Sequence, residues 1–336
     1  MSYRRVSIAF LIAIASLWAQ TKPANPRGHA ERIAPQPPSF DPNVIGSTNQ
    51  PEFHPKDKGS GVARAEILLD RVHFSCGQID GYFGSNLEKT VAAYQGDRHL
   101  PVTRIIDSQT WAALNADKAP LLVRYTISPD DEAGPFVKVP REMMAQAKLK
   151  FLGYASPLEE LSERFHASPE LMQGINPGVD FSQAGQEIWV PNVLTMPPGQ
   201  AAQVVVSKGE SSVRAYDANG KLLAFYVATI GSEHDPLPVG NWKITGIQHN
   251  PYFHYNAELF WDARNKDEKA LIKPGPRNPV GLVWMDLSKE HYGIHGTPDP
   301  SKIGHTFSHG CIRLTNWDAL ELAAMVQPGT PAILKE

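Results

Sequence analysis

The hydrophobic pattern changes once along this chain, and that change limits the folds open to it. Before residue 197, apolar residues recur at helical spacings, as at Ala65, Leu68 and Val72. From Gln203 onward, short β-branched runs are separated by turn residues, which is typical of strands. Neither pattern alone describes the chain. The sequence therefore predicts a multidomain α+β protein built from modules of different type.

Length and composition set further limits. At roughly 150 residues per domain, 336 residues predict about two folded units. Hydrophobic residues make up 42% of the chain and charged residues 20%, which excludes a wholly disordered or fibrous protein. The 32 basic and 35 acidic residues give a net charge of -3, so no overall field directs the chain to nucleic acid. Two cysteines, Cys76 and Cys311, are too few for a disulfide scaffold or a four-cysteine zinc site.

The first 60 residues have no pattern that could form a core. Arg4-Arg5 precedes an uncharged apolar run, 6–21, which is typical of a secretory signal and shorter than the ~20 residues that span a bilayer. We expect residues 1–19 to be a signal peptide. An uncleaved N-terminal anchor is the alternative, and it is the one expected contact with a membrane. Residues 20–60 contain eight prolines and almost no apolar periodicity, which predicts a disordered spacer.

Residues 61–117 contain the signals of three short helices. Ser85 with Glu88 has the pattern of a capping box, and Asp107 can cap the helix that carries Trp111. The glycine-rich loop between the first two helices is by itself an ordinary turn. With its sequence IDGYFG, however, the segment resembles the peptidoglycan-binding domain, which implies docking to the cell wall without chemistry. The wall-binding candidates are Asp80, Gly81, Tyr82, Phe83 and Gly84.

Residues 121–195 show a different pattern. A strand near Tyr125 is followed by Ser156-Pro157 and Ser168-Pro169, which each predict a helix start, and a closing strand is expected within 185–191. Glu159 is expected to complete a capping box with Ser156. The segment resembles a lysin-motif domain, a β-α-α-β fold that binds N-acetylglucosamine-containing glycans. An insertion at 132–156 departs from that family, so a purely structural spacer domain is the alternative.

Residues 202–336 are predicted to form a mostly β domain with one late helix. Asn219-Gly220 is a strong hairpin signal. Thr315 can cap a helix that continues to about Val326, before Pro328-Gly329 ends it. The predicted strands are 204–206, 213–216, 222–229, 242–247, 280–287, 292–295 and 331–334.

Cys311 lies in the densest polar cluster of the chain. Ser308, His309 and Gly310 directly precede it, and His295 is not far away in the sequence. A thiol becomes a nucleophile when a nearby imidazole takes its proton. Both histidines are candidates for that base. His309 is only two residues from the thiol, so chain continuity limits where its ring can go, whereas His295 can approach across a loop.

Two neighbours of Cys311 suit acyl transfer. Gly310 allows backbone N–H groups to face a reacting carbonyl, and Arg313 can hold a substrate carboxylate. On the residues alone, three other interpretations stay open: an inert buried thiol, a zinc site and an inactive descendant that only binds its polymer. The zinc site would use the H-x-x-x-H pairs that begin at His291 and His305, but glycine and proline nearby argue against the helix that would align them.

Four segments of this last part of the chain carry a specific resemblance. They are HGT at 295–297, SHGCIRL at 308–314, PLPVGNWKI at 236–244 and GPRNPVG at 275–281. Together they resemble the L,D-transpeptidase catalytic domain. The resemblance implies that Cys311 is the nucleophile, that His295 is the general acid and base, and that the Gly296 carbonyl orients the imidazole. The residues implied to shape the site are Ser308, His309, Gly310 and Arg313.

The implied reaction is acyl transfer on the stem peptides of peptidoglycan. The Cys311 thiolate attacks the carbonyl of the third stem residue, the terminal D-alanine leaves, and a thioester remains. An amine of a second stem then forms a 3-to-3 crosslink. Water as the acceptor would make the chain an L,D-carboxypeptidase, and a protein amine would make it a protein-to-wall attachment enzyme. We expect the aromatic-rich segment 250–279, which includes Phe260 and Trp261, to be a lid that excludes water, with a surface loop as the alternative.

Two hypotheses from different classes follow. The first is an exported cysteine L,D-transpeptidase, in the periplasm or facing the wall, that contacts peptidoglycan stem peptides and glycan strands. It needs no cofactor and no metal and has no nucleic-acid partner. The second is a non-catalytic peptidoglycan-binding protein with an idle site. In both, Cys76 is a small hydrophobe, and we expect Cys76 and Cys311 to be free thiols because a bond between them would silence the site.

Overall fold

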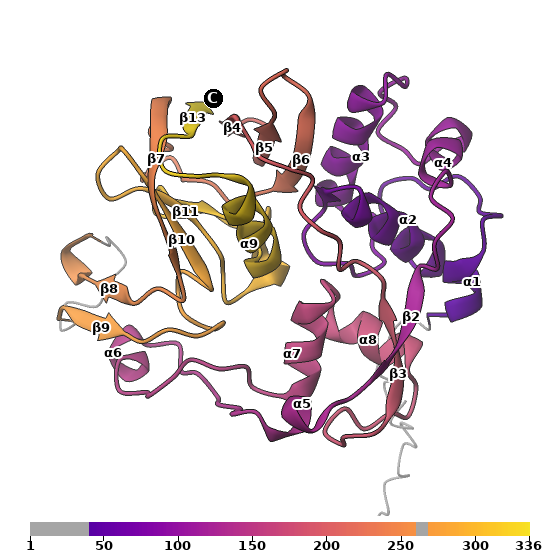
Figure 1. Cartoon of the computed structure of the whole chain (residues 1–336), viewed down its shortest axis with the longest axis horizontal. Helices are drawn as coiled ribbons and strands as arrows, with labels where there is room; N and C mark the ends of the chain where they lie inside the picture. Colours follow the sequence, from indigo (N-terminus) through magenta and orange to yellow (C-terminus); the bar gives the residue numbers. More distant parts are fainter. Residues whose placement is uncertain (1–39, 260–267) are drawn as a thin grey trace, which may run out of the picture. The chain divides into compact units, whose positions relative to one another are not determined.

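Three successive parts of the chain fold into modules with different secondary structure (Figure 1). The computed structural model describes residues 40–259 and 268–336, all of which belong to one unit, 37–336. The expected signal peptide and the spacer up to residue 39 lie outside the described residues. Within the described part of the chain, no helix is long and apolar enough to cross a membrane.

The first module is helical, as expected. Its helices are α1 (Pro42–Gly46), α2 (Ser60–Arg71), α3 (Ser85–Asp97) and α4 (Ser108–Leu114). Asp107 caps α4, because its carboxylate accepts a hydrogen bond of 2.8 Å from the Thr110 N–H. The expected capping box at Ser85 is wrong. Gly84 is the N-cap of α3 and offers no side chain, so Ser85 is already the first residue of the helix.

The spacer predicted to be disordered ends earlier than residue 60. Phe40 and Ile45 are buried in the core of the first module. Phe53 and Ile106 exchange backbone hydrogen bonds of 3.1 and 3.0 Å. These apolar residues are spaced too widely to form a helical stripe, and a search for periodicity therefore misses them. The part of the spacer that the structure describes, 40–60, is folded.

The second module has the expected β-α-α-β order. It contains β2 (Leu122–Thr126), α7 (Pro157–Arg164), α8 (Pro169–Ile175) and β3 (Glu187–Pro191), and the two strands pair antiparallel. Ser156 and Ser168 cap the helices by accepting from the N–H groups of Glu159 and Leu171. The expected capping box is wrong. The Glu159 carboxylate accepts a hydrogen bond of 2.6 Å from the Ala155 N–H instead of from the Ser156 N–H.

The insertion in the second module joins it to the third. Two short helices that the sequence did not indicate lie at its start and inside it, α5 (Pro129–Ala133) and α6 (Met143–Gln146). The third module contributes a hairpin of β8 (Phe253–Tyr255) and β9 (Ala270–Ile272). Leu152 from the insertion is buried together with Tyr255 and Ile272 of that hairpin, in a small core of its own. Strands β8 and β9 of segment 250–279 are therefore in contact with the second module.

The third module is mostly β with one late helix, as expected. Its remaining elements are β4 (Gln203–Ser207), β5 (Ser212–Tyr216), β6 (Leu222–Val227), β7 (Gly240–His249), η1 (Ala257–Leu259), β10 (Val283–Leu287), β11 (Gly293–His295), η2 (Pro300–Lys302), β12 (Ile312–Arg313), α9 (Asn316–Met325) and β13 (Pro331–Lys335). Thr315 caps α9 by accepting from the Asp318 N–H at 3.1 Å. Apolar residues of α9 pack on the sheet to form the second large core of the described residues.

One sheet runs through the third module and receives a strand from the first. In the described residues its order is β1-β6-β5-β4-β13-β7-β10-β11-β12. The edge strand β1 (Phe74–Ser75) lies just after α2 and pairs parallel with β6, with Phe74 opposite Phe225. At the other edge, β11 and β12 are the strands that carry the predicted catalytic residues. The boundary between the first and third modules therefore crosses the sheet.

Candidate active site

Two neighbouring parallel strands place the predicted nucleophile and base on one face of the sheet. β11 and β12 pair with Ile294 opposite Ile312 and His295 opposite Arg313. Side chains alternate along a strand, so Cys311, two residues before Arg313, is expected on the same face as Arg313 and His295. Ile294 and Ile312 point the other way and are fully buried. Burial of the two isoleucines thus turns the three polar residues away from the core.

The imidazole of His295 is held neutral and in one orientation. Its Nδ1 lies 2.7 Å from the Gly296 carbonyl oxygen, and because a carbonyl only accepts, Nδ1 must carry the proton in this bond. Burial and, to a smaller extent, the positive charge of Arg313 lower the pKa of His295 to about 3, against the opposing effect of the Gly296 hydrogen bond. The imidazole is therefore neutral at pH 7, with the lone pair on Nε2. The ring of Trp284 stacks on it with centroids 5.1 Å apart.

Cys311 rests as a thiol rather than as a thiolate. Burial raises its pKa, and a backbone hydrogen bond from Gly293 and the charge of Arg313 offset this only in part. Gly293 is the residue that the strand register places across from Cys311. The Sγ also lies 3.8 Å from the carbonyl oxygen of His291, which suits a weak S–H donor. Cys311 and His295 thus rest as a neutral thiol and a neutral imidazole, and the thiol would have to lose its proton to act as a nucleophile.

The loop before Cys311 is fixed by backbone contacts. The buried Ser308 donates its hydroxyl to the Cys311 carbonyl, and its N–H donates to the Ile230 carbonyl at 3.2 Å. Gly310 has φ +99°, and a Cβ there would lie 2.7 Å from the ring of Tyr292. Only glycine fits at this position. His309 is half-buried beside it, so all four residues predicted to surround the thiol lie in this loop or in β12.

Three side chains at the site were not predicted. Trp284 covers the His295 ring from the neighbouring strand, and Tyr292 lies against Gly310. The side chain of Asn316, at the start of α9, lies against Gly296, where an added Cβ would be 2.1 Å from its Oδ1. Each of these contacts depends on which strand lies beside which. Alternation in 280–287 predicted a strand but gave no way to infer that Trp284 would face His295.

The loop proposed for wall binding presents only part of its surface. Phe83 is completely buried, and Gly81 is packed against Phe40. The N–H groups of Asp80 and Gly81 bond the buried carboxylate of Glu66. The side chains that reach the surface are those of Asp80 and Tyr82, while Gly84 is half-buried at the start of α3. Phe83 and Gly81 therefore shape the loop from inside.

The two cysteines are free, as expected. Cys76 is buried in the core shared by the first two modules, and burial raises its pKa well above the ordinary value. Across residues 40–259 and 268–336, no three His, Cys, Asp or Glu side chains are grouped so that they could hold a metal ion. His291 has a largely exposed ring near Glu290, whereas His295 is buried. The pairs considered for zinc therefore do not converge.

A half-buried thiol and a neutral, oriented imidazole carried by neighbouring strand segments at the edge of a β-sheet are typical of a thiol-dependent acyl-transfer enzyme. A family model described as the L,D-transpeptidase catalytic domain matches residues 201–334. A model for a peptidoglycan-binding domain matches residues 58–114. The two matches coincide with the third and first modules.

Curated relatives agree with these matches. The chain is 33% identical over 175 residues to the L,D-transpeptidase YkuD of Bacillus licheniformis, which covers 52% of this chain and 90% of that protein. It is 29% identical over 184 residues to the L,D-transpeptidase YbiS of Escherichia coli, covering 53% of this chain and 60% of that protein. The chain therefore belongs to the L,D-transpeptidase family and is a cysteine-dependent enzyme of that class.

Solved structures add a weaker likeness. L,D-transpeptidase 3 from Mycobacterium tuberculosis, in complex with a faropenem-derived adduct, aligns with a TM-score of 0.34 and 17% identity over 46% of this chain and 75% of that one. An L,D-transpeptidase from Xylanimonas cellulosilytica aligns with a TM-score of 0.38 and 14% identity over 85% of this chain and 98% of that one. At these scores the likeness supports no conclusion about this chain.

Proposed function

We propose that the chain crosslinks peptidoglycan through a thioester on Cys311. The observation that carries the proposal is the pairing of β11 with β12, which brings Cys311 and a neutral, oriented His295 to one face of the sheet. A neutral imidazole with its lone pair on Nε2 can accept the thiol proton. The L,D-transpeptidase match covers both strands, and the match in the first module is to a domain that binds peptidoglycan, the proposed substrate.

The proposed chemistry has two half-reactions. As the Cys311 Sγ attacks the carbonyl carbon of the third stem residue, His295 Nε2 takes the thiol proton. The tetrahedral intermediate collapses, the bond to the terminal D-alanine nitrogen breaks, and the imidazolium gives that nitrogen the proton. A thioester remains. The amine of a second stem, typically the side-chain amino group of a diaminopimelate, then attacks the thioester, loses a proton to His295 and restores the thiol.

The Ser308–Cys311 loop can stabilise the oxyanion of each intermediate. The left-handed conformation of Gly310 turns successive backbone N–H groups near the thiol, which is how an oxyanion hole is usually built. Arg313 shares the face of Cys311 and is proposed to hold a carboxylate of the stem peptide. His309 is proposed to line the site rather than to act as the base, because His295 has the oriented and buried ring.

The β8–β9 hairpin is proposed to be the lid that protects the thioester from water. Tyr252 at its base is about half exposed, at 47%, and is available to a ligand. Phe260 and Trp261, which also suggested a lid, lie outside the described residues. A lid is needed because water competes with the amine for the acyl group. Water as acceptor would give carboxypeptidase activity, and a protein amine would give wall attachment.

Peptidoglycan is the partner, and both family matches indicate a location at the cell wall or outside the cytoplasm. We propose that residues 1–19 export the chain, that Asp80 and Tyr82 contact the wall, and that the second module is a lysin-motif-like glycan binder. The β-α-α-β order supports the last proposal. The insertion supports the alternative, a purely structural domain, because the insertion packs against the third module.

The test is product formation from a disaccharide tetrapeptide, with intact-protein mass spectrometry to detect the acyl-enzyme. Wild type is expected to gain the mass of the stem minus D-alanine and to form 3-to-3 dimers, and Cys311→Ala to do neither. Cys76→Ala is the matched control, because it also removes one thiol and should keep activity. Unchanged turnover by Cys311→Ala would sink the proposal, and absence of an adduct on wild type would favour the idle wall-binding protein.

Analysis of the muropeptide products then identifies the acceptor. Dimers indicate an amine of a second stem, tripeptides indicate water, and peptidoglycan linked to polypeptide indicates a protein amine. Loss of activity with a chelator would revive the zinc interpretation.

The pH dependence of thiol alkylation tests the neutral resting pair. Because burial raises the pKa of Cys311, its alkylation by iodoacetamide should become fast only at a higher pH than that of an ordinary exposed cysteine. A resting thiolate–imidazolium pair would instead react at a constant rate from mildly acidic pH upward. Peptide mapping separates Cys311 from Cys76, whose burial should keep it unmodified in the folded protein.

A further inference from the structure

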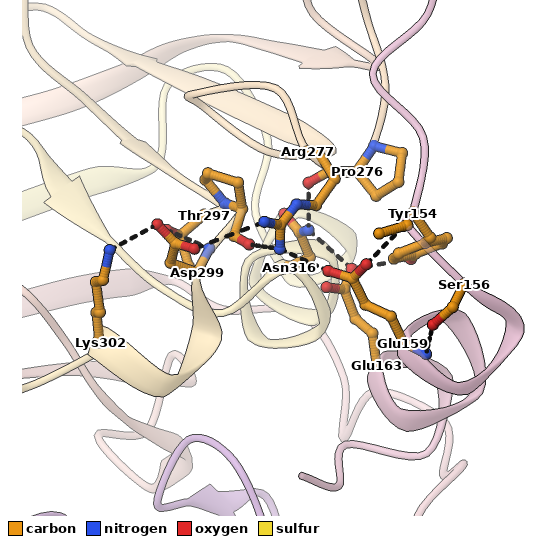
Figure 2. Close-up of polar contacts among 12 residues, drawn as sticks. Tyr154, Ser156, Glu159, Glu163, Pro276, Arg277, Thr297, Asp299, Lys302 and Asn316 are labelled. Carbon is orange, nitrogen blue, oxygen red and sulfur yellow. Dashed lines mark hydrogen bonds and ion pairs between the residues drawn. The ribbon is translucent and has the colours of Figure 1, made fainter. Parts of the chain in front are cut away.

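Glu159 and Glu163 of the second module contact Arg277 and Asn316 of the catalytic module (Figure 2). Leu152 makes backbone hydrogen bonds to Pro274 and Arg277, at 3.2 and 3.0 Å. Glu159 of α7 forms an ion pair of 2.6 Å with Arg277. The same Arg277 Nη1 donates to the Pro298 carbonyl at 2.6 Å. Arg277 therefore joins α7 to the loop that follows His295.

A second route runs from the next turn of the same helix. Glu163 is buried, and its Oε1 accepts hydrogen bonds from the Tyr154 hydroxyl at 2.9 Å and from the Asn316 amide at 2.8 Å. The Asn316 amide also donates to the Pro276 carbonyl at 3.2 Å. Its Oδ1 accepts from the Leu282 N–H at 3.0 Å. With both ends of its amide bonded, the side chain of Asn316 has one orientation.

That orientation bears on the catalytic histidine. An added Cβ on Gly296 would lie 2.1 Å from Asn316 Oδ1, so the amide and the Gly296 backbone are in direct contact. The Gly296 carbonyl in turn accepts the Nδ1 proton of His295. Three successive contacts thus connect Glu163 of the second module to the imidazole. We call Leu152, Glu159 and Glu163 the brace.

We propose that Glu159 and Glu163 of the brace are positioning residues for His295, so that the second module takes part in catalysis and does not serve only to bind glycan. Glu163 sets Asn316 and thereby the Gly296 carbonyl, while Glu159 sets Arg277 and thereby the loop at Pro298. Neither residue touches the thiol or the substrate. The inference depends on the proposed function, because it assigns a purpose to the geometry of that same site.

The charged surroundings of Glu163 define what its replacement changes. Asn316 and Arg277 face it from the catalytic module, and Tyr154 and Glu159 from its own module. Burial, helped by the nearby Glu159 carboxylate, raises the pKa of Glu163 to about 7, although the hydrogen bonds from Asn316 and Tyr154 act to lower it. Glutamine keeps the accepting Oε1 without a charge, whereas methionine fills a similar volume without an acceptor. The two variants therefore separate the hydrogen bond from packing.

The experiment measures crosslinking kinetics of full-length Glu163→Met, Glu163→Gln and Glu160→Gln. Glu160 is the matched control, because it follows Glu159 on the same helix but pairs with Arg164 of that helix and makes none of the brace contacts. We expect Glu163→Met to lower kcat about tenfold or more with KM within about twofold, in the range seen when groups that orient catalytic ligands are removed. Glu163→Gln should keep wild-type kcat at pH 6, and Glu160→Gln should keep it throughout.

The acylation rate, read by mass spectrometry, distinguishes failure of this inference from failure of the proposed function. No acyl-enzyme on wild type would overturn the proposed function and this inference with it. Wild-type acylation together with unchanged acylation of folded Glu163→Met would overturn the inference alone. If Glu163→Met does not fold, Glu159→Gln decides. We expect it to lower kcat about threefold at constant KM, and an unchanged kcat overturns the inference.

Discussion

The first and second modules both contact the catalytic module, but with different chemistry. The first does so through apolar side chains and a shared sheet: Phe74 pairs in register with Phe225, their rings stack 6.2 Å apart, and both are buried. The second module has an apolar contact at Leu152, but near the site its contacts are polar, through Glu159 and Glu163. The first junction is built around a shared sheet and buried rings, with hydrogen bonds from Ser75 and Asn86 beside them, whereas near the site the second is built from hydrogen bonds and an ion pair.

The difference separates stability from control. An apolar junction contributes free energy in proportion to the buried area and depends little on pH or salt. A polar junction contributes less net free energy, but it fixes orientation and responds to protonation. The first module is therefore expected to determine whether the sheet folds, and the second to determine how well the site is arranged. Three predictions test this division.

The largest effect is expected at the apolar junction. Phe74→Ala removes a ring that also meets Tyr94 edge-on at 5.4 Å, and it should lower the free energy of unfolding by about 3–5 kcal/mol. Urea unfolding followed by circular dichroism measures this change. Tyr82→Ala, which removes an exposed ring of the same module, is the control and should cost little. Two separate transitions, with that of the catalytic module unchanged, would show that the first module is not part of the common core.

A smaller, pH-dependent effect is expected at Glu163. Its pKa rises to about 7 on folding, so between pH 4.5 and 7 the folded state binds more protons than the unfolded state. The contribution of this group to the free energy of unfolding is therefore most favourable at low pH. It falls as the pH rises to about 7 and is constant above that pH. Relative to Glu163→Gln, wild type should lose on the order of 2–3 kcal/mol between pH 5 and pH 8. Urea midpoints at the two pH values test this, and a constant difference contradicts it.

The smallest effect is expected from Gly275→Ala. The new Cβ would lie 2.2 Å from the Leu152 carbonyl oxygen, so the turn held by the brace must shift. Gly178→Ala is a close control, because it also has positive φ but nothing within 4 Å. Gly275→Ala should cost about 1 kcal/mol more than the control and should lower kcat. Equal stability and activity of the two variants would show that the contact of the turn with Leu152 of the brace contributes to neither.

The sequence predicted what depends on near neighbours. Helix starts at Asp107, Ser156 and Thr315 were correct, because a cap needs only the residues that follow it. The chemistry of the third module was also predicted, because SHGCIRL is a dense and specific pattern. The resemblance supplied His295 as the base, which the residues alone had left open between it and His309.

What the sequence could not provide were contacts between distant segments. Nothing in the helical pattern of residues 61–117 indicates that Phe74 would form a strand in the sheet of another module. Glu159 was predicted as a partner in a cap and instead bonds Arg277 and the Ala155 N–H. Asn316 appeared as an unremarked helix residue, yet it lies against Gly296. Each depends on the tertiary arrangement, which periodicity does not encode.

The position of β1 has a consequence for how such a gene can be divided. Residues 201–334 hold every residue assigned to the chemistry, so recombination at residue 201 would transfer the whole reaction. It would also leave β6 as a bare edge, with unpaired N–H and C=O groups along Phe225 and Tyr226. Such an edge invites pairing with another copy. The segment that can be inherited alone as an enzyme is therefore longer than the segment that carries the chemistry, and it extends back at least to Phe74.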